Sequence, residues 1–210
     1  MVCVCATMAL GLMFSVRSNA VPASQIVEQS IAEMSNADSY RIEFDYRGRI
    51  SSDDEIYRSA PDAEMVSGTL YILNHEGAPL TRIDWNDSQR NSAIWNGKKY
   101  IHLQNGKVVK TKPAKPLDEL YKLLSFKTIP NGILKDAVIE ESDGIINATL
   151  KTKSSGPKHI LGNAQFSRAN KRLENVSVIY HDGVKDLEVI IADSIIYGIP
   201  LPIEMFMLGQ

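Results

Sequence analysis

The chain has 210 residues, of which 44% are hydrophobic and 23% are charged, and its formal net charge at pH 7 is −2. This length suits one domain that is large enough to bury a sizeable core. The near balance of acidic and basic residues argues against a nucleic-acid-binding surface and against an acidic interaction tail.

The first 20 residues have the pattern of a secretory signal peptide. The 15 residues from Val2 to Val16 carry no charge, which is short for a membrane span but typical of the apolar region of a signal. Small residues at the last and third-last positions predict cleavage before Val21, which leaves one domain over residues 21–210. An uncleaved membrane anchor is the alternative, because no Lys or Arg precedes the apolar run.

Both cysteines of the chain, Cys3 and Cys5, lie in the predicted signal peptide. A mature chain that begins at Val21 therefore has no disulfide, no thiolate nucleophile and no cysteine-based zinc site.

The mature chain begins with a helical pattern, which then gives way to strands. Pro22 to Met34 predicts an amphipathic helix with Ser24 as its N-cap. Residues 40–50 alternate between apolar and charged side chains, which predicts a strand with one polar face. The apolar face of this strand consists of Tyr40, Ile42, Phe44 and Tyr46.

Residues 68–110 predict an antiparallel meander, because short apolar segments alternate with turn residues. Asn96-Gly97 and Asn105-Gly106 predict two-residue hairpins of type I′, in which both central residues need a positive φ. Asp143-Gly144 and Asp182-Gly183 predict two further hairpins in the second half of the chain.

A second helix is predicted after a proline-containing break in the β pattern. Leu117, Leu120 and Leu124 recur at helical spacing, and Phe126 widens the apolar face. With about ten short strands and helices only at the start and in the middle, the chain predicts a mainly β (α+β) protein. Its expected architecture is a strongly curved antiparallel sheet, or incomplete β-barrel, with helices covering the concave side.

Sequence signals for catalysis or metal binding are not found. The histidines, at positions 75, 102, 159 and 181, show no spacing typical of a metal site. No nucleophile elbow, phosphate-binding loop or dinucleotide-binding fingerprint occurs. We therefore expect no catalytic residue, no metal and no cofactor, and a binding protein rather than an enzyme.

Several motifs in the meander follow one another in an informative order. They are Gly68, Leu70 and Ile72; then Pro79; then Arg82 and Trp85; then Trp95, Asn96, Gly97, Lys98 and Tyr100. The tail from Ile191 to Phe206 adds a strand pattern followed by a proline-containing corner and a Phe. From about Val21 to Leu208, this order resembles the periplasmic outer-membrane lipoprotein carriers, the LolA-like family.

The resemblance implies a function as well as a fold. It implies a periplasmic chaperone of a Gram-negative bacterium that binds lipoprotein acyl chains in a hydrophobic cavity and carries them from the inner to the outer membrane. The implied partners are lipoproteins, an inner-membrane lipoprotein-releasing transporter and an outer-membrane receptor, and the implied state is a monomer. The alternatives are an envelope sensor or regulatory lipid-binding module on the same fold, a carrier of another amphiphile, and an enzyme.

The candidate site residues follow from this reading. On composition alone, the large apolar rings are core residues; the resemblance implies instead that they face a cavity too large for the chain to fill. Arg82 is the candidate for the arginine that latches the lid in the family, since Asn74 lies near the place where that arginine is expected. The predicted cavity and lid residues are Leu70, Ile72, Trp85, Trp95, Tyr100, Leu117, Leu120, Leu124 and Phe126.

Overall fold

The structure is a computed structural model that describes residues 20–47, 66–113, 137–151, 159–181 and 186–207. The predicted helix at residues 117–126, nearly all of the predicted signal peptide and the predicted turn at residues 182–183 lie outside these ranges.

Among the described elements, one α-helix precedes the strands, as the sequence predicts for the start of the mature chain. In chain order they are α1 (Ala23–Ser35), β1 (Ser39–Arg47), β2 (Val66–His75), β3 (Ala78–Trp85), β4 (Asn91–Trp95), β5 (Lys99–Gln104), β6 (Lys107–Pro113), β7 (Val138–Ser142), β8 (Ile145–Lys151), β9 (His159–Ser167), β10 (Arg172–His181), β11 (Asp186–Tyr197) and the short 3-10 helix η2 (Ile203–Met205).

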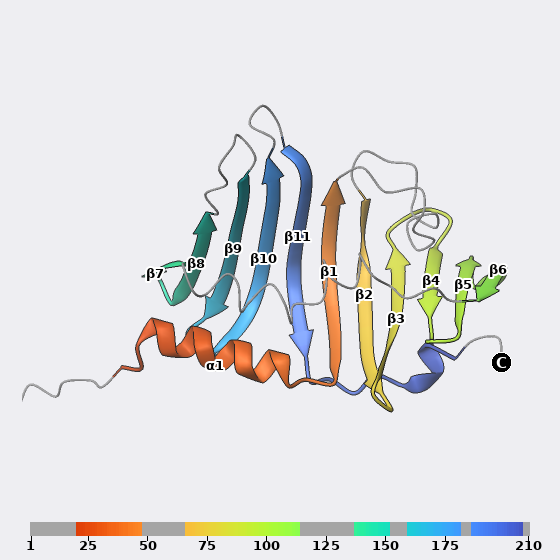
Figure 1. The fold of residues 1–210 in the computed structure, drawn as a ribbon, viewed down its shortest axis with the longest axis horizontal. Helices are drawn as coiled ribbons and strands as arrows, with labels where there is room; N and C mark the ends of the chain where they lie inside the picture. The colour runs from red at the N-terminus through yellow and green to blue at the C-terminus, as the bar shows by residue number, and fades with distance from the viewer. Residues whose placement is uncertain (1–19, 48–65, 114–136, 152–158, 182–185, 208–210) are drawn as a thin grey trace, which may run out of the picture.

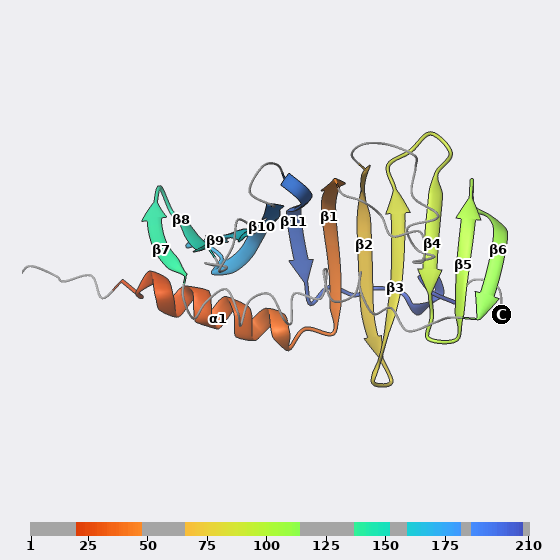
Figure 2. The ribbon, with the colours of Figure 1, turned by 45° about the horizontal axis from the view of Figure 1, so that its top comes forward.

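All the described strands form one antiparallel sheet in the order β6-β5-β4-β3-β2-β1-β11-β10-β9-β8-β7 (Figure 1). The last strand, β11, lies between β1 and β10, so it joins the first half of the sheet to the second. The sheet curves around α1 without closing, which is clearest after the 45° turn of Figure 2. The predicted fold, a curved and unclosed antiparallel sheet with a helix on its concave side, is confirmed.

Helix α1 forms for the reason predicted, but it starts differently. Its buried side chains are Ile26, Val27, Ser30, Ile31 and Met34, which form the expected stripe. The predicted N-cap at Ser24 is wrong: the helix begins at Ala23, with Pro22 as N-cap and without a side-chain cap. Pro22 fixes the entry into the helix instead, and its carbonyl oxygen accepts the first backbone hydrogen bonds.

The strands have two different faces, because successive side chains of a strand point to opposite sides. We call the side on which α1 packs the inner face and the opposite side the outer face. Ile42 on β1, Leu70 on β2 and Ile83 on β3 are ladder partners on the inner face and are fully buried. One cluster of buried side chains joins this inner face to α1.

The turns confirm most of the predicted hairpins. Asn105-Gly106 and Asp143-Gly144 have positive φ at both residues, as a type I′ turn requires. At Asn96-Gly97 the hairpin is confirmed but the turn type is wrong, because only Gly97 has a positive φ. There the central residues are Gly97 and Lys98, and the Asn96 Oδ1 atom accepts hydrogen bonds from the amides of Lys98 and Lys99.

After β11 the chain passes along one end of the sheet and reaches the outer face of β2–β5 (Figure 1). Phe206 is fully buried there. It belongs to a second hydrophobic cluster, separate from the inner one, whose buried members are Leu80, Ile94, Ile101, Leu103 and Phe206. The sheet therefore packs apolar residues on both sides of its β2–β5 half.

Candidate functional site

Five of the predicted ligand-binding residues lie together on the inner face of β2–β5. Ile72 on β2 and Trp95 on β4 flank the same residue of β3, and Tyr100 on β5 continues this row. Leu70 and Trp85 lie further along β2 and β3 on the same face. The residues predicted from the meander thus lie on one largely apolar surface.

This surface is buried in the structure. Leu70, Ile72, Trp85 and Tyr100 are each at most 4% exposed, and Trp95 is partly exposed. A ligand can reach these side chains only if whatever shields them moves aside. Whether they contact acyl chains stays a prediction.

Three neighbouring strands, β1, β2 and β3, approach one another closely near Trp85. Phe44 on β1 packs edge-to-face against Trp85 on β3, with ring centroids 5.8 Å apart and an interplanar angle of 74°. Gly68 on β2 lies between them in the register. A Cβ atom on Gly68 would lie 2.7 Å from the carbonyl oxygen of Asp84 and 3.4 Å from Cζ of Phe44, so the close approach of β2 to β3 requires glycine at this position.

Helix α1 is fixed across the other half of the inner face. Its main contacts are with β7, β8, β9 and β10. At its C-terminal end the Tyr40 hydroxyl donates to the carbonyl oxygen of Met34 at 2.6 Å. Arg172 Nη2 donates to Glu33 Oε1 at 2.9 Å, and its guanidinium carbon lies 4.3 Å from the centroid of the Tyr197 ring.

The N-terminal end of α1 is held by Arg168, whose Nη1 atom donates to the carbonyl oxygen of Val21 at 3.0 Å. Arg168 also forms a two-pronged ion pair with Glu141. Hydrogen bonding to Arg168 lowers the pKa of Glu141 below its ordinary range. Because hydrogen bonds join both ends of α1 to residues of the sheet, the position of α1 on the inner face is fixed.

The predicted lid residues Leu117, Leu120, Leu124 and Phe126 lie outside the described residues. Their part in the site therefore stays a prediction from their helical spacing.

The candidate latch residue, Arg82, lies on the outer face of the sheet. Its Nε atom donates to Asp84 Oδ1 at 2.8 Å, and its Nη1 atom donates to the carbonyl oxygen of Met205 at 3.4 Å. These contacts hold the C-terminal segment and point away from the row of Trp95 and Tyr100. The described contacts thus connect Arg82 with the C-terminal segment, and its role as a latch remains untested.

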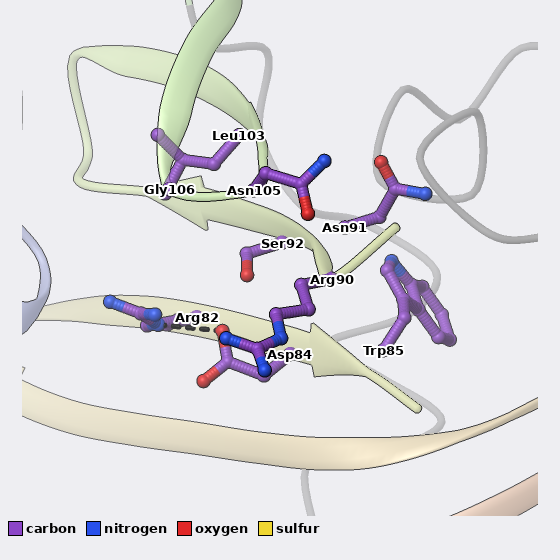
Figure 3. Close-up of a pocket in the computed structure, with 9 residues that line it drawn as sticks. All are labelled: Arg82, Asp84, Trp85, Arg90, Asn91, Ser92, Leu103, Asn105 and Gly106. Carbon is purple, nitrogen blue, oxygen red and sulfur yellow. Dashed lines mark hydrogen bonds and ion pairs between the residues drawn. The ribbon is translucent and has the colours of Figure 1, made fainter. Parts of the chain in front are cut away.

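A polar hollow of about 500 Å³ lies beside Arg82, at the ends of β3 and β4 (Figure 3). Arginines, an acid, a hydroxyl and amides converge on it, and Arg90 adopts a left-handed backbone conformation with a φ of +47°. Such a lining suits a small polar or anionic group rather than an acyl chain. Its residues are Arg82, Asp84, Trp85, Arg90, Asn91, Ser92, Leu103, Asn105 and Gly106.

Titratable residues of the described part of the chain were compared with the requirements of a metal site. Within the ranges given above, no group of three or more His, Cys, Asp or Glu side chains could hold a metal ion. His102 lies 3.2 Å from Asn91 Oδ1, and burial, followed by the charge of Lys110, lowers its pKa. A histidine with a lowered pKa is neutral at pH 7 and adds no charge to the inner face.

Two residues of the inner face, Phe44 and Thr81, were not among the candidate residues predicted from the sequence. Phe44 was placed on the apolar face of its strand but not in the site, although it completes the aromatic pair with Trp85. Thr81 was not considered, although it has the same parity along β3 as Ile83 and Trp85. That alternation could have placed it on the inner face.

The fold defines a class of protein: an open, strongly curved antiparallel sheet with a helix packed on its inner face. LprF from Mycobacterium bovis shares this fold, with a TM-score of 0.54 and 13% identity over 86% of this chain and 95% of LprF. The lipoprotein LppX from Mycobacterium tuberculosis also shares it, with a TM-score of 0.51 and 13% identity over 86% of this chain and 97% of LppX.

At this identity the two likenesses show a common fold. No protein-family model matches the sequence, and no curated protein matches it. None of the described helices is both long and apolar enough to cross a bilayer.

Proposed function

We propose that the protein is a periplasmic carrier that binds the acyl chains of lipoproteins on the inner face of β2–β5. The observation that carries this proposal is the largely apolar surface on one side of an unclosed sheet that contains Leu70, Ile72, Trp85, Trp95 and Tyr100. Helix α1 has its main contacts on the other half of that side.

Such a surface suits acyl chains for a simple energetic reason. Burial of each methylene group contributes about 0.8 kcal/mol, so a long chain gains on the order of 10 kcal/mol when it leaves water. Burial and dispersion are non-directional, and a lining of rings and aliphatic side chains therefore accepts chains of variable length.

A carrier of this kind also needs a movable cover, because most of the candidate surface is buried. We assign the cover to the segment that contains Leu117, Leu120, Leu124 and Phe126, whose apolar stripe matches the surface in character. Displacement of this segment by an entering chain would exchange one apolar partner for another, at little cost in burial free energy.

The route across the envelope is the part of the proposal that rests on the sequence resemblance. We propose that cleavage before Val21 releases the domain into the periplasm. There it receives lipoproteins from an inner-membrane lipoprotein-releasing transporter and delivers them to an outer-membrane receptor. The fold shared with LprF and with the lipoprotein LppX is compatible with this assignment.

The test compares Trp95→Asp with a matched change on the opposite face, Tyr71→Asp. Both residues are partly exposed aromatic side chains, on β4 and β2, but only Trp95 lies on the proposed surface. A charge at position 95 should weaken binding of a fluorescent triacylated lipopeptide by at least about tenfold, because the carboxylate would be buried against an acyl chain. Tyr71→Asp should bind within about twofold of the unmodified protein.

Circular dichroism and thermal unfolding show whether both variants remain folded. Equal binding by two folded variants would contradict the proposed surface. Mass spectrometry of the ligand that co-purifies from the periplasm tests the cargo: a triacylated peptide supports the lipoprotein carrier, and a different lipid shows a carrier of another amphiphile.

A further inference from the structure

Thr81 is a polar residue in the middle of the apolar inner face. It lies on β3 between its ladder partners Ile72 on β2 and Trp95 on β4. Ile83, two residues further along β3, faces the same side and is fully buried. Thr81 is 4% exposed, so its hydroxyl group is removed from water.

Among the residues that the structure describes, the Thr81 hydroxyl oxygen has no hydrogen-bond partner. A buried hydroxyl without a partner destabilises a folded protein, because the hydrogen bonds that it makes with water in the unfolded chain are lost. Valine would fill nearly the same volume without a polar atom. Packing alone therefore does not account for a threonine at this position.

Polar groups elsewhere on the inner face already make other interactions. The Tyr40 hydroxyl donates to the carbonyl oxygens of Met34 and Ala37. Trp95 and Tyr100, which follow Thr81 in the same row, each have an interaction of their own. The missing partner of Thr81 is thus best supplied by a molecule that occupies the inner face.

We propose that the Thr81 hydroxyl donates a hydrogen bond to the carbonyl oxygen of an ester or amide at the head of a bound acyl chain. This inference rests on the proposed function, and it adds the class of ligand. The apolar side chains around Thr81 bind the hydrocarbon part, and the hydroxyl fixes the position of the first polar group along the chain.

The charges in this row favour a neutral head group. Among the described residues of the row, the first basic side chain is Lys112 on β6, the ladder partner of Tyr100. Three strand spacings, about 14 Å, separate β6 from β3. An ionised carboxylate at Thr81 would be buried without an opposite charge nearby, whereas an uncharged carbonyl group needs only the hydroxyl donor.

The test uses the full chain and three competitors that displace a fluorescent acyl probe. Methyl palmitate has the ester carbonyl group, hexadecane has only the hydrocarbon chain, and palmitate has a charged head group. Thr81→Val removes the hydroxyl, and Thr81→Ser is the matched control that keeps it.

We expect Thr81→Val to weaken displacement by methyl palmitate about two- to tenfold, which is the range of one net hydrogen bond, and to leave hexadecane unchanged. Thr81→Ser should keep the affinity for methyl palmitate within about twofold. Without ligand, Thr81→Val should raise the melting temperature, because it removes a buried polar atom that lacks a partner.

Three results would overturn the assignment of Thr81: an unchanged affinity of Thr81→Val for methyl palmitate, an equal loss for hexadecane, or a lower melting temperature of this variant. An equal loss for palmitate and methyl palmitate would overturn the neutral head group. If the unmodified protein releases the probe to none of the competitors, the proposed function itself fails, and Thr81 loses its role with it.

Discussion

At the scale of single residues, the acidic pair on the outer face gives the fold a dependence on pH. The β1–β11 ladder changes register between Glu43 and Phe44, so that Asp193 has no ladder partner of its own on β1. This bulge brings Asp193 beside Asp45. Burial, followed by the charge and the hydrogen bond of Asp193, raises the pKa of Asp45 above its ordinary value of 3.8.

The direction of the effect follows from proton binding. The unfolded chain releases the Asp45 proton near pH 3.8, whereas the folded chain holds it to a higher pH. Between these two values the folded state binds more protons, so the free energy of unfolding falls as the pH rises through this window. At neutral pH the pair therefore destabilises the folded state, and below pH 3.8 this destabilisation disappears.

We accordingly predict that Asp45→Asn raises the melting temperature at pH 7 and that the gain shrinks to nothing as the pH falls below 3.8. The measurement is thermal unfolding between pH 3 and pH 7. Glu140→Gln on β7, where the carboxylate is exposed, is the matched control and should show no such trend. A gain of the same size at pH 3 and pH 7 would contradict the raised pKa of Asp45.

At the scale of elements, local patterns were enough to predict most of the strands and turns. Alternation placed Tyr40, Ile42 and Phe44 on one face, and the pairs Asn105-Gly106 and Asp143-Gly144 marked turns, because both signals depend on neighbours in sequence. The turn at Asn96 was predicted with the wrong type. Its side chain accepts two backbone hydrogen bonds, which favours Gly97 and Lys98 as the central residues.

Long-range pairing could not be predicted in the same way. Nothing in the β11 sequence specifies that it lies between β1 and β10 or that the residues after it pack on the outer face of β2–β5. The hydrogen bond from Arg82 to the carbonyl oxygen of Met205 on the outer face also joins residues far apart in the sequence, and no local pattern predicts it. The inner-face surface could be predicted in part, since Leu70, Ile72 and Trp95 are apolar. Thr81 carries no apolar signal, so only its parity with Ile83 and Trp85 along β3 could have placed it on this face.

The C-terminal segment, residues 201–207, packs on the outer face of β2–β5 and stabilises this half of the sheet. We predict that Phe206→Ala lowers the free energy of unfolding by about 3 to 5 kcal/mol, because it empties a fully buried ring position in the outer cluster. Glu204→Ala, an exposed change in the adjacent η2, should stay within about 0.5 kcal/mol. Denaturant unfolding measures both values.

The same two variants also test whether the inner and outer faces of the sheet act independently. Because the Phe206 cluster is distinct from the inner cluster, the folded fraction of Phe206→Ala should bind the lipopeptide as the unmodified protein does. A large loss of affinity in folded protein would show instead that the C-terminal segment and the proposed ligand surface are coupled.

At the scale of the whole molecule, the unclosed sheet leaves β6 and β7 as edge strands, each paired with one neighbour in the described sheet. An open curved sheet leaves room for a ligand, but its edges can pair with other chains. Strand β6 carries lysines at positions 107, 110 and 112 and ends at Pro113. Lysine and proline on an edge are typical means of preventing edge-to-edge association.

The edge lysines should therefore keep the protein monomeric. We predict that Lys110→Thr combined with Lys112→Thr produces a dimer that grows with protein concentration, since two copies of β6 could then pair antiparallel about a twofold axis. Light scattering coupled to size-exclusion chromatography measures the mass. The control, Lys98→Thr with Lys171→Asn, removes the same charge from two exposed turn positions and should remain monomeric. Asparagine replaces Lys171 because the backbone there has a φ of +58°, which a β-branched side chain rarely adopts. If both double variants associate equally, net charge rather than the β6 edge controls association; if neither does, the curvature of the sheet alone is enough to protect its edge.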